Sequence, residues 1–123
     1  MKTIKKWSIW KAGLDPVVGS EQGKTRPVLV ISETEINKIL RVINVLPLTS
    51  CKRGRTIYPN EALLKSKQFG LEKNSIVLCY QIRTLDKKRL LSEYGVIDDP
   101  DKQTEIIESL CFQLGIERLG VSN

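Results

Sequence analysis

The stretch Gly19-Ser-Glu-Gln-Gly-Lys-Thr-Arg-Pro-Val-Leu-Val-Ile-Ser32 decides how the rest of the chain can be arranged. Its first half is a polar loop, and its second half, Pro27 to Ile31, is an apolar run with the length of one buried strand. Proline is tolerated at the first residue of a strand. Arg26 therefore stands where a polar loop meets a core strand, a place that often carries function. The alternative is that Arg26 is only a solvated cation at a strand end.

The composition predicts one compact domain over residues 1–123, with enough apolar residues (41%) for a true core. No apolar run approaches the roughly 20 residues that a membrane-spanning helix needs. The basic start, Met1-Lys-Thr-Ile-Lys-Lys-Trp7, is not followed by the apolar segment of a secretory signal. We therefore expect a cytoplasmic protein.

The cysteine and histidine content argues against disulfides and metal sites. The chain has three well-separated cysteines, Cys51, Cys79 and Cys111, and no histidine. An odd number of dispersed cysteines is typical of reduced thiols, and zinc sites are built mainly from histidine and paired cysteines. We expect no cofactor and no metal, so any acid–base chemistry must use carboxylates, Arg, Lys, Tyr or hydroxyl groups.

The positive charge is concentrated in the first half of the chain. Residues 1–60 hold 11 Lys and Arg against four acidic residues, whereas residues 61–123 hold nine against ten. Such asymmetry indicates a polyanionic partner, with nucleic acid favoured over a membrane because no basic amphipathic helix accompanies it. The alternative is a soluble surface that is simply basic.

Short apolar or alternating segments between turn residues predict a mostly β protein. Strands are expected at residues 7–12, 27–32, 41–46 and 75–82, with a shorter one at 62–65. Loops or turns are expected at residues 17–25, 33–39 and 87–94, and Pro47 is expected to end the strand before it.

One helix is expected near the C-terminus, over residues 100–114. Asp99 and Pro100 form a helix-start signal, and Gly115 is a suitable C-terminal cap. Ile106, Leu110 and Leu114 share one helical face. Many short strands and one late helix predict a small, mostly antiparallel β-barrel on which the helix packs.

Three polar clusters each adjoin a predicted core strand. They are Glu21, Gln22, Lys24, Thr25 and Arg26; Thr49, Ser50, Lys52, Arg53 and Arg55; and Gln81, Arg83 and Thr84. If the three strands are neighbours, the clusters converge into a groove whose cations neutralise phosphates and whose amide and hydroxyl groups contact bases. The alternative is that they are independent surface charges.

Several short segments resemble a known family. They are, in order, Leu14-Asp-Pro16, Gly19-Ser-Glu-Gln22, Lys24-Thr-Arg-Pro27, Leu46-Pro-Leu-Thr-Ser50, Gly70-Leu71, Gln81-Ile-Arg-Thr-Leu-Asp86 and Arg89-Leu90. No single segment is specific, but together, over about residues 7–119, they resemble the MazF/PemK toxins of bacterial toxin–antitoxin modules. The resemblance implies an SH3-like barrel of the CcdB/PemK type with a C-terminal α-helix, and a homodimer.

The resemblance also implies an activity. The family cuts single-stranded RNA, including mRNA, at a short sequence without a metal, and leaves a 2′,3′-cyclic phosphate and a 5′-hydroxyl. The matching catalytic pair is Arg26 and Thr49, with Glu21 nearby as a contributor. A cognate antitoxin inhibits such a toxin, and its acidic, extended C-terminal segment would occupy the basic groove.

The residue types suit this chemistry. The substrate's own 2′-hydroxyl attacks the phosphate, so the site must remove a proton, stabilise the growing negative charge and protonate the leaving oxygen. Arg26 can stabilise the charge because its guanidinium matches phosphate oxygens, but it is a poor base. Thr49 can bond a phosphate oxygen, and Glu21 is the only nearby group with base-like chemistry. The identity of the base stays open.

The remaining polar residues of the three clusters are predicted RNA contacts. They are Gln22, Lys24, Thr25, Ser50, Lys52, Arg53, Arg55, Gln81 and Arg83. The chain departs from the family pattern at Trp7-Ser8, where Gly-Asp is usual, and at Tyr80, where an acidic residue is common. The second departure leaves the RNA sequence preference open.

Two other functions remain alternatives. Toxins related to the family poison DNA gyrase through the end of the C-terminal helix and an apolar dimer surface, without an Arg–Thr site. A catalytically silent RNA-binding module is the other alternative. In the ribonuclease interpretation, the loop from Val17 to Thr25 is expected to move to admit RNA.

Overall fold

Residues 2–118, which the computed structural model describes, form seven antiparallel strands and two α-helices. The strands are β1 (Ser8–Gly13), β2 (Thr25–Val30), β3 (Val42–Ser50), β4 (Glu61–Leu64), β5 (Ser75–Leu78), β6 (Arg83–Asp86) and β7 (Leu90–Val96). The helices are α1 (Thr34–Ile39) and α2 (Pro100–Leu114), with short 3₁₀ turns η1 (Cys79–Gln81) and η2 (Lys87–Arg89). None of the helices in this part of the chain is both long and apolar enough to cross a bilayer.

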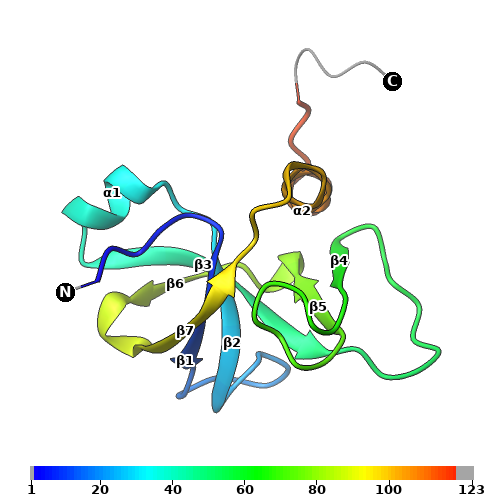
Figure 1. The fold of residues 1–123 in the computed structure, drawn as a ribbon, viewed down its shortest axis with the longest axis horizontal. Helices are drawn as coiled ribbons and strands as arrows, with labels where there is room; N and C mark the ends of the chain where they lie inside the picture. The colour runs from blue at the N-terminus through cyan, green and yellow to red at the C-terminus, as the bar shows by residue number, and fades with distance from the viewer. Residues whose placement is uncertain (1, 119–123) are drawn as a thin grey trace.

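The strands form one curved sheet in the order β4-β5-β3-β2-β1-β7, and β6 also pairs with β3 (Figure 1). The predicted mostly β fold with a C-terminal helix is therefore confirmed. Within residues 2–118 the hydrogen-bonded path ends at β4 and β7, so backbone ladders do not close the sheet into a full barrel.

Two glycines bring the ends of this path together. A Cβ built on Gly70, in the loop between β4 and β5, would overlap the carbonyl oxygen of Tyr94 in β7. A Cβ on Gly95 would in turn overlap the carbonyl oxygen of Phe69. Gly70 also has a φ of 83°, in the left-handed region that glycine adopts without strain. The β4–β5 loop thus closes on β7 by a backbone contact that excludes any side chain.

Both faces of the central strands are buried. Leu29 and Leu46 join a cluster that includes Ile106 of α2, whereas Val28 and Val45 join a second cluster on the opposite face. Neighbouring residues of a strand point to opposite faces. This double burial explains why Pro27 to Ile31 has an uninterrupted apolar sequence.

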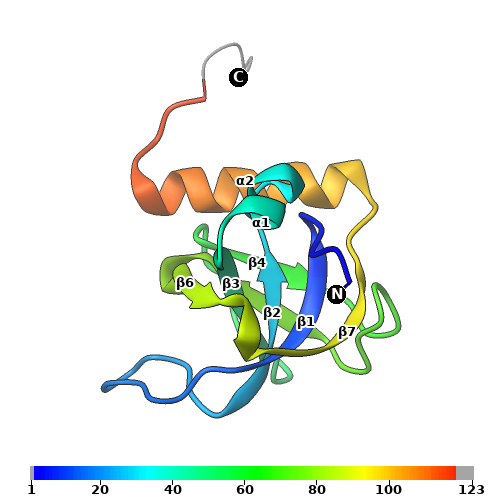
Figure 2. The ribbon, with the colours of Figure 1, turned by 90° about the vertical axis from the view of Figure 1, so that its left-hand side faces the viewer.

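The predicted C-terminal helix is confirmed as α2, with the same bounds. The Asp99 side chain accepts a hydrogen bond from the backbone N–H of Asp101, and Gly115, with a φ of 67°, ends the helix. Ile106 is fully buried, but Leu114, expected on the same face, is 48% exposed at the end of the helix. Figure 2 shows α2 lying across one end of the sheet, with the β1–β2 loop at the opposite end.

The prediction of a loop over residues 33–39 is wrong, because α1 lies there. Its Asn37 is buried, and the Asn37 side-chain amide donates to the carbonyl oxygens of Ile4 and Ser32, each at 3.0 Å. Ile36 and Ile39 stay exposed, so the segment has no clear amphipathic pattern. Tertiary hydrogen bonds, which local sequence does not reveal, hold this short helix in place.

Pro47 does not end its strand, contrary to the prediction. β3 continues to Ser50, and Pro47 pairs with Val28 of β2. On its other edge β3 pairs with β6 through residues 42–45 and with β5 through residues 48–50. Pro47 lies in the gap between these two ladders.

The same gap divides the strand predicted at residues 75–82. Two residues of β3 separate Val45 from Leu48, whereas five residues separate their partners, Arg83 and Val77. The partner side therefore contains three extra residues. The 3₁₀ turn η1 takes up this excess between β5 and β6. Residues 87–94, predicted as a helical turn or loop, form η2 and then most of β7.

Replacing Gly95 with alanine is expected to lower the free energy of unfolding by about 1–3 kcal/mol, because the new methyl group overlaps a fixed carbonyl of the β4–β5 loop. Urea denaturation measures the effect. Gly13→Ala is the control, since a Cβ at Gly13 meets nothing within 4 Å. Equal stability of the two variants would contradict the proposed backbone closure.

Candidate functional site

The β2–β3 register indicates how two predicted catalytic residues, Arg26 and Thr49, lie relative to each other. The ladder pairs Leu29 with Leu46 and Val28 with Pro47. Continuing this register by two residues brings Arg26 opposite Thr49. Opposite residues of an antiparallel pair project from the same face, and both side chains are half-buried. The hydrogen-bonded ladder ends at Val28 and Pro47, and beyond it β3 pairs with β5, so Arg26 and Thr49 lie just past the ladder at the ends of their strands.

Arg26 also has an unsatisfied hydrogen-bond donor. Its Nε is buried and has no hydrogen-bond partner among residues 2–118. A buried donor without a partner costs about 1–3 kcal/mol, and folded proteins retain few of them. An anion bound beside the guanidinium would satisfy this donor. The orphaned Nε is therefore a sign of an anion-binding role.

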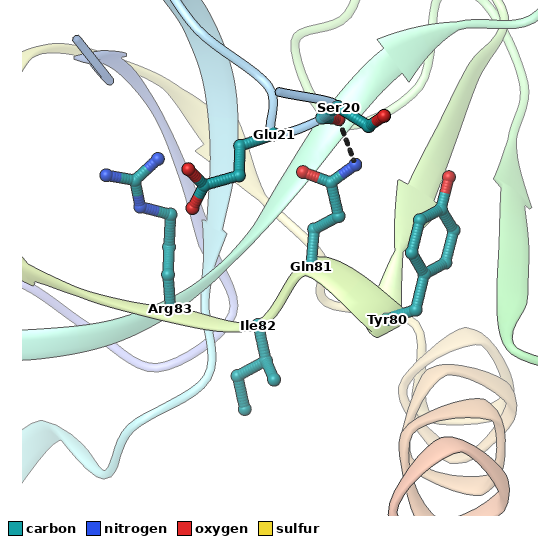
Figure 3. A pocket seen from close by; sticks show the side chains of 6 residues that line it. All are labelled: Ser20, Glu21, Tyr80, Gln81, Ile82 and Arg83. Carbon is teal, nitrogen blue, oxygen red and sulfur yellow. Dashed lines mark hydrogen bonds between the residues drawn. The ribbon is translucent and has the colours of Figure 1, made fainter. Parts of the chain in front are cut away.

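Glu21 lies in the β1–β2 loop, which we define as residues 14–24. The residue is exposed, and its Oε1 accepts a hydrogen bond from the backbone N–H of Val18 at 2.5 Å. The backbone N–H of Glu21 donates to the carbonyl oxygen of Val18 at 3.2 Å. Figure 3 shows the Glu21 carboxylate pointing toward the guanidinium of Arg83. The loop thus presents this carboxylate in a defined direction.

A pocket of about 360 Å³ lies between the β1–β2 loop and the chain around η1 (Figure 3). It is lined by Ser20, Glu21, Tyr80, Gln81, Ile82 and Arg83. The Gln81 side chain accepts from the backbone N–H of Gln22 at 2.8 Å and donates to the carbonyl oxygen of Ser20 at 3.3 Å. The first and third predicted clusters therefore meet, and Gln81 joins them.

The two ends of the β1–β2 loop are held by hydrogen bonds other than those that hold its tip. The backbone N–H of Leu14 donates to the carbonyl oxygen of Lys24 at 2.7 Å, and the N–H of Lys24 donates to Asp15 Oδ1 at 2.8 Å. Arg89 donates to the carbonyl oxygens of Gly13, at 3.2 Å, and Asp15. The Lys24 and Thr25 side chains remain exposed next to Arg26.

The second cluster follows the end of β3. Ser50 pairs with Ser75 in the last position of the β3–β5 ladder, and Lys52 and Arg53 are exposed in the turn that follows. A hydrogen bond from the backbone N–H of Arg55 to the carbonyl oxygen of Lys52, at 3.1 Å, closes this turn. Lys52 and Arg53 are therefore free to meet a phosphate backbone.

Arg55 has a different environment from its basic neighbours. Its guanidinium makes two hydrogen bonds to Glu61, at 2.9 and 2.7 Å, and the Glu61 side chain is only 1% exposed. The hydrogen bond from Arg55, together with that from the N–H of Tyr58, holds the pKa of Glu61 below its usual value despite the opposing effect of burial. Arg55 thus supports the start of β4, and its predicted contact with RNA stays a prediction.

The cysteines show no arrangement for chemistry. Cys79 is buried, and desolvation raises the pKa of its thiol to about 12. Cys51 and Cys111 are half-buried free thiols. Within residues 2–118 no group of three His, Cys, Asp or Glu side chains is placed to bind a metal ion.

Sequence reasoning missed the anchors of the β1–β2 loop. Asp15 and Arg89 fix its base, while the backbone of Ser20 and Gln22 receives the Gln81 side chain. Asp15 and Arg89 lie in two of the segments that resemble the family, but nothing in the sequence indicated what they would bond. The sequence does not indicate which side chain will bond a given backbone group, so these contacts can be seen only in the structure.

Arg55→Ala is expected to lower the free energy of unfolding at neutral pH by roughly 2–3 kcal/mol, because it leaves the buried Glu61 carboxylate without its main partner. In the parent protein, the stabilisation from ionised Glu61 is present above its unfolded pKa of about 4.3 and is lost as the pH falls toward the lower folded pKa. The variant should lose this pH dependence, which urea titrations across pH measure.

Lys67→Ala is the matched control for that variant. It breaks an exposed ion pair, Lys67–Glu72, whose side chains are 79% and 87% exposed. We expect a change within about 0.5 kcal/mol. A similar loss of stability in both variants would contradict the structural role of the Arg55–Glu61 pair.

Comparison with known proteins places the chain in a family. Residues 5–114 match the family model of the PemK-like, MazF-like toxins of type II toxin–antitoxin systems. Among solved structures, MazF from Deinococcus radiodurans (Form-I) is 26% identical with a TM-score of 0.78, covering 94% of this chain and 100% of that one.

Two mycobacterial structures show the same fold. The Mycobacterium tuberculosis toxin MazF-mt6 is 22% identical with a TM-score of 0.74, covering 90% of this chain and 99% of that one. An endoribonuclease from a mycobacterial species, solved with its cognate antitoxin, is 21% identical with a TM-score of 0.74, covering 94% and 98%. Because the family model spans most of its length, the chain belongs to the PemK-like, MazF-like toxins of type II toxin–antitoxin systems.

Proposed function

We propose that this toxin is a sequence-specific endoribonuclease that cuts single-stranded RNA, including mRNA, without a metal. The observation that carries the proposal is the buried, unpartnered Nε of Arg26, which lies on β2, the strand that pairs with the strand of Thr49. Such a guanidinium suits a phosphate oxygen, because both the charge and the free donor are then used. The exposed Lys24, Lys52 and Arg53 extend the positive surface on which RNA would lie.

The proposed reaction uses the nucleophile of the substrate itself. The 2′-oxygen loses its proton and forms a bond to the adjacent phosphorus, and the bond from phosphorus to the 5′-oxygen breaks. The products are a 2′,3′-cyclic phosphate and a 5′-hydroxyl, once the leaving oxygen takes up a proton. Arg26 stabilises the negative charge that grows on the phosphate oxygens, and Thr49 donates a hydrogen bond to one of them.

The carboxylate of Glu21 is the group that we assign to removing the 2′-hydroxyl proton. Among Arg26, Thr49 and Glu21 it alone has base-like chemistry at neutral pH. It sits on a loop that is anchored at its base by Asp15 and near its tip by Gln81, so its backbone has a defined place. Arg26 and Thr49 come from core strands, whereas the base comes from the loop beside them.

We further propose a homodimer in the cytoplasm that is inhibited by a cognate antitoxin. An acidic, extended antitoxin segment would lie on the basic surface around Lys24, Lys52 and Arg53 and exclude RNA. The charge distribution supports this, because the excess of Lys and Arg lies in residues 1–60. The mycobacterial endoribonuclease solved with its antitoxin gives a precedent within the fold.

Arg26→Ala should lower the rate of RNA cleavage by about 10²- to 10³-fold, the usual effect of removing one preorganised charge-stabilising donor. The assay is incubation of the purified protein with a long RNA in EDTA, followed by mapping of the cut ends. Arg41→Ala is the control, because Arg41 is an exposed arginine outside the three clusters. Uncut RNA, with trapped gyrase–DNA complexes or with simple RNA binding, would reject the proposed ribonuclease.

The two exposed cations after β3 should act through phosphates. For single-stranded RNA, each lost phosphate contact reduces the slope of log affinity against log salt concentration by about 0.7. The double variant Lys52→Ala, Arg53→Ala should therefore flatten the slope by about 1.4, as RNA-binding titrations over a range of salt concentration would show. Lys65→Ala, Lys88→Ala removes the same charge from exposed positions elsewhere. An equal flattening in that control would mean that only net charge matters.

A further inference from the structure

We propose that Gln81 is a positioning residue that fixes the place of Glu21 by holding the residues on either side of it. Gln81 thereby orders the β1–β2 loop in the free protein. Its kinetic consequence rests on the proposed ribonuclease activity.

The Gln81 amide uses both of its functional groups on the loop. Its Oε1 accepts from the N–H of Gln22 at 2.8 Å, and its Nε2 donates to the carbonyl oxygen of Ser20 at 3.3 Å. These two residues are the immediate neighbours of Glu21. Figure 3 shows the amide beneath the loop, with Glu21 directed to one side of it. We call this pair of hydrogen bonds the Gln81 bridge.

The Gln81 bridge starts from a rigid part of the fold. Gln81 is the last residue of η1, the turn whose first residue, Cys79, is fully buried. Cys79 belongs to the same apolar cluster as Ile106 of α2. This turn takes up the three extra residues that lie opposite Pro47. A β-bulge likewise takes up an extra residue and redirects a side chain. A side chain fixed in this way can position a flexible segment.

The tip of the loop has few other supports. Within the described residues, the other long-range side-chain hydrogen bond to residues 16–23 runs from Arg83 to the carbonyl oxygen of Gln22, at 3.5 Å. The bonds between Val18 and Glu21 are local to the tip. Without Gln81, the tip would keep its turn but lose its main connection to the sheet.

This role differs from the direct reading of a base by Gln81. In the free protein the amide oxygen and one N–H already have backbone partners, so the amide is committed to the loop. A positioning role predicts a loss of turnover through a displaced Glu21, whereas base reading predicts weaker or altered RNA selection with an unchanged loop.

The test begins with hydrogen–deuterium exchange of the free protein. In Gln81→Ala, the Gln22 amide loses its acceptor, and its exchange should become about tenfold faster. RNA cleavage should show a kcat lower by about ten- to a hundredfold, with KM changed less than about threefold, because a displaced catalytic group affects turnover more than binding. Gln103→Ala is the matched control, since this glutamine side chain donates to the carbonyl oxygen of Ile97 and not to the loop.

Gln81→Glu provides a readout that a general loss of packing would not give. At neutral pH the carboxylate still accepts from Gln22 but has no proton for the Ser20 carbonyl, so loop exchange should be faster than in the parent protein. Protonation near the ordinary Glu pKa of about 4.3 restores a donor and an acceptor on the same atoms. Loop protection should then return toward that of the parent protein at the same pH.

Unchanged exchange at Gln22 in Gln81→Ala, with slow exchange in β3 showing an intact fold, would overturn the proposal. A change confined to KM or to the cleaved sequence would also overturn it, in favour of base reading. If the parent protein cuts no RNA but the two variants change exchange as described, the Gln81 bridge stands and the proposed ribonuclease falls.

Discussion

The β2–β3 register is the constraint on which the rest of the structure depends. Both faces of these strands are buried, with Leu29 and Leu46 in one cluster and Val28 and Val45 in the other. A shift of this register by one residue would turn each set of side chains to the opposite face of the sheet, away from the cluster in which it packs. Continued past the end of the ladder, the same register would set Arg26 level with Thr49. The packing of the core therefore constrains where these two polar residues can lie.

Pro47 shows how a single residue can shape a distant part of the site. Proline lacks an N–H, so it cannot complete a ladder on both edges of a strand. β3 keeps its pairing with β2 at this position, and the strand on the other edge divides into β5 and β6 around η1. The turn carries Tyr80 and Gln81 into the pocket beside the β1–β2 loop. A residue expected to end one strand instead interrupts its neighbour.

The features that sequence predicts here are those with local signals. Asp99 caps the start of α2 with its side chain, and Pro100 and Gly115 fix its two ends through their backbone preferences. The apolar run after Arg26 indicates a doubly buried strand. α1 has no such signal, because the buried hydrogen bonds of Asn37 hold it. The approach of Gly70 to Gly95 is equally invisible, since it depends on two segments that only the completed fold brings together.

The basic residues follow the same rule. Arg26 and Arg55 both adjoin strands in the sequence, yet the guanidinium of Arg55 is occupied by the buried Glu61, while Arg26 retains an unpartnered buried nitrogen. Composition gives the number of cations, but the partner of each one decides whether it stabilises the fold or is available to a ligand. The two roles differ in the structure because the Glu61 carboxylate is placed against the guanidinium of Arg55.

In the proposed function the β1–β2 loop is ordered in the free protein and displaced when RNA enters, and the strength of the Gln81 bridge would suit both. A side-chain hydrogen bond contributes about 0.5–1.5 kcal/mol net, so two of them favour the held state by a factor of roughly 5 to 150. An RNA or antitoxin segment that offers the loop comparable contacts can therefore replace the bridge at little cost. A backbone ladder across the same residues would hold Glu21 more firmly but would oppose that exchange. The use of one amide side chain thus reconciles a defined position for Glu21 with access to the surface beneath it.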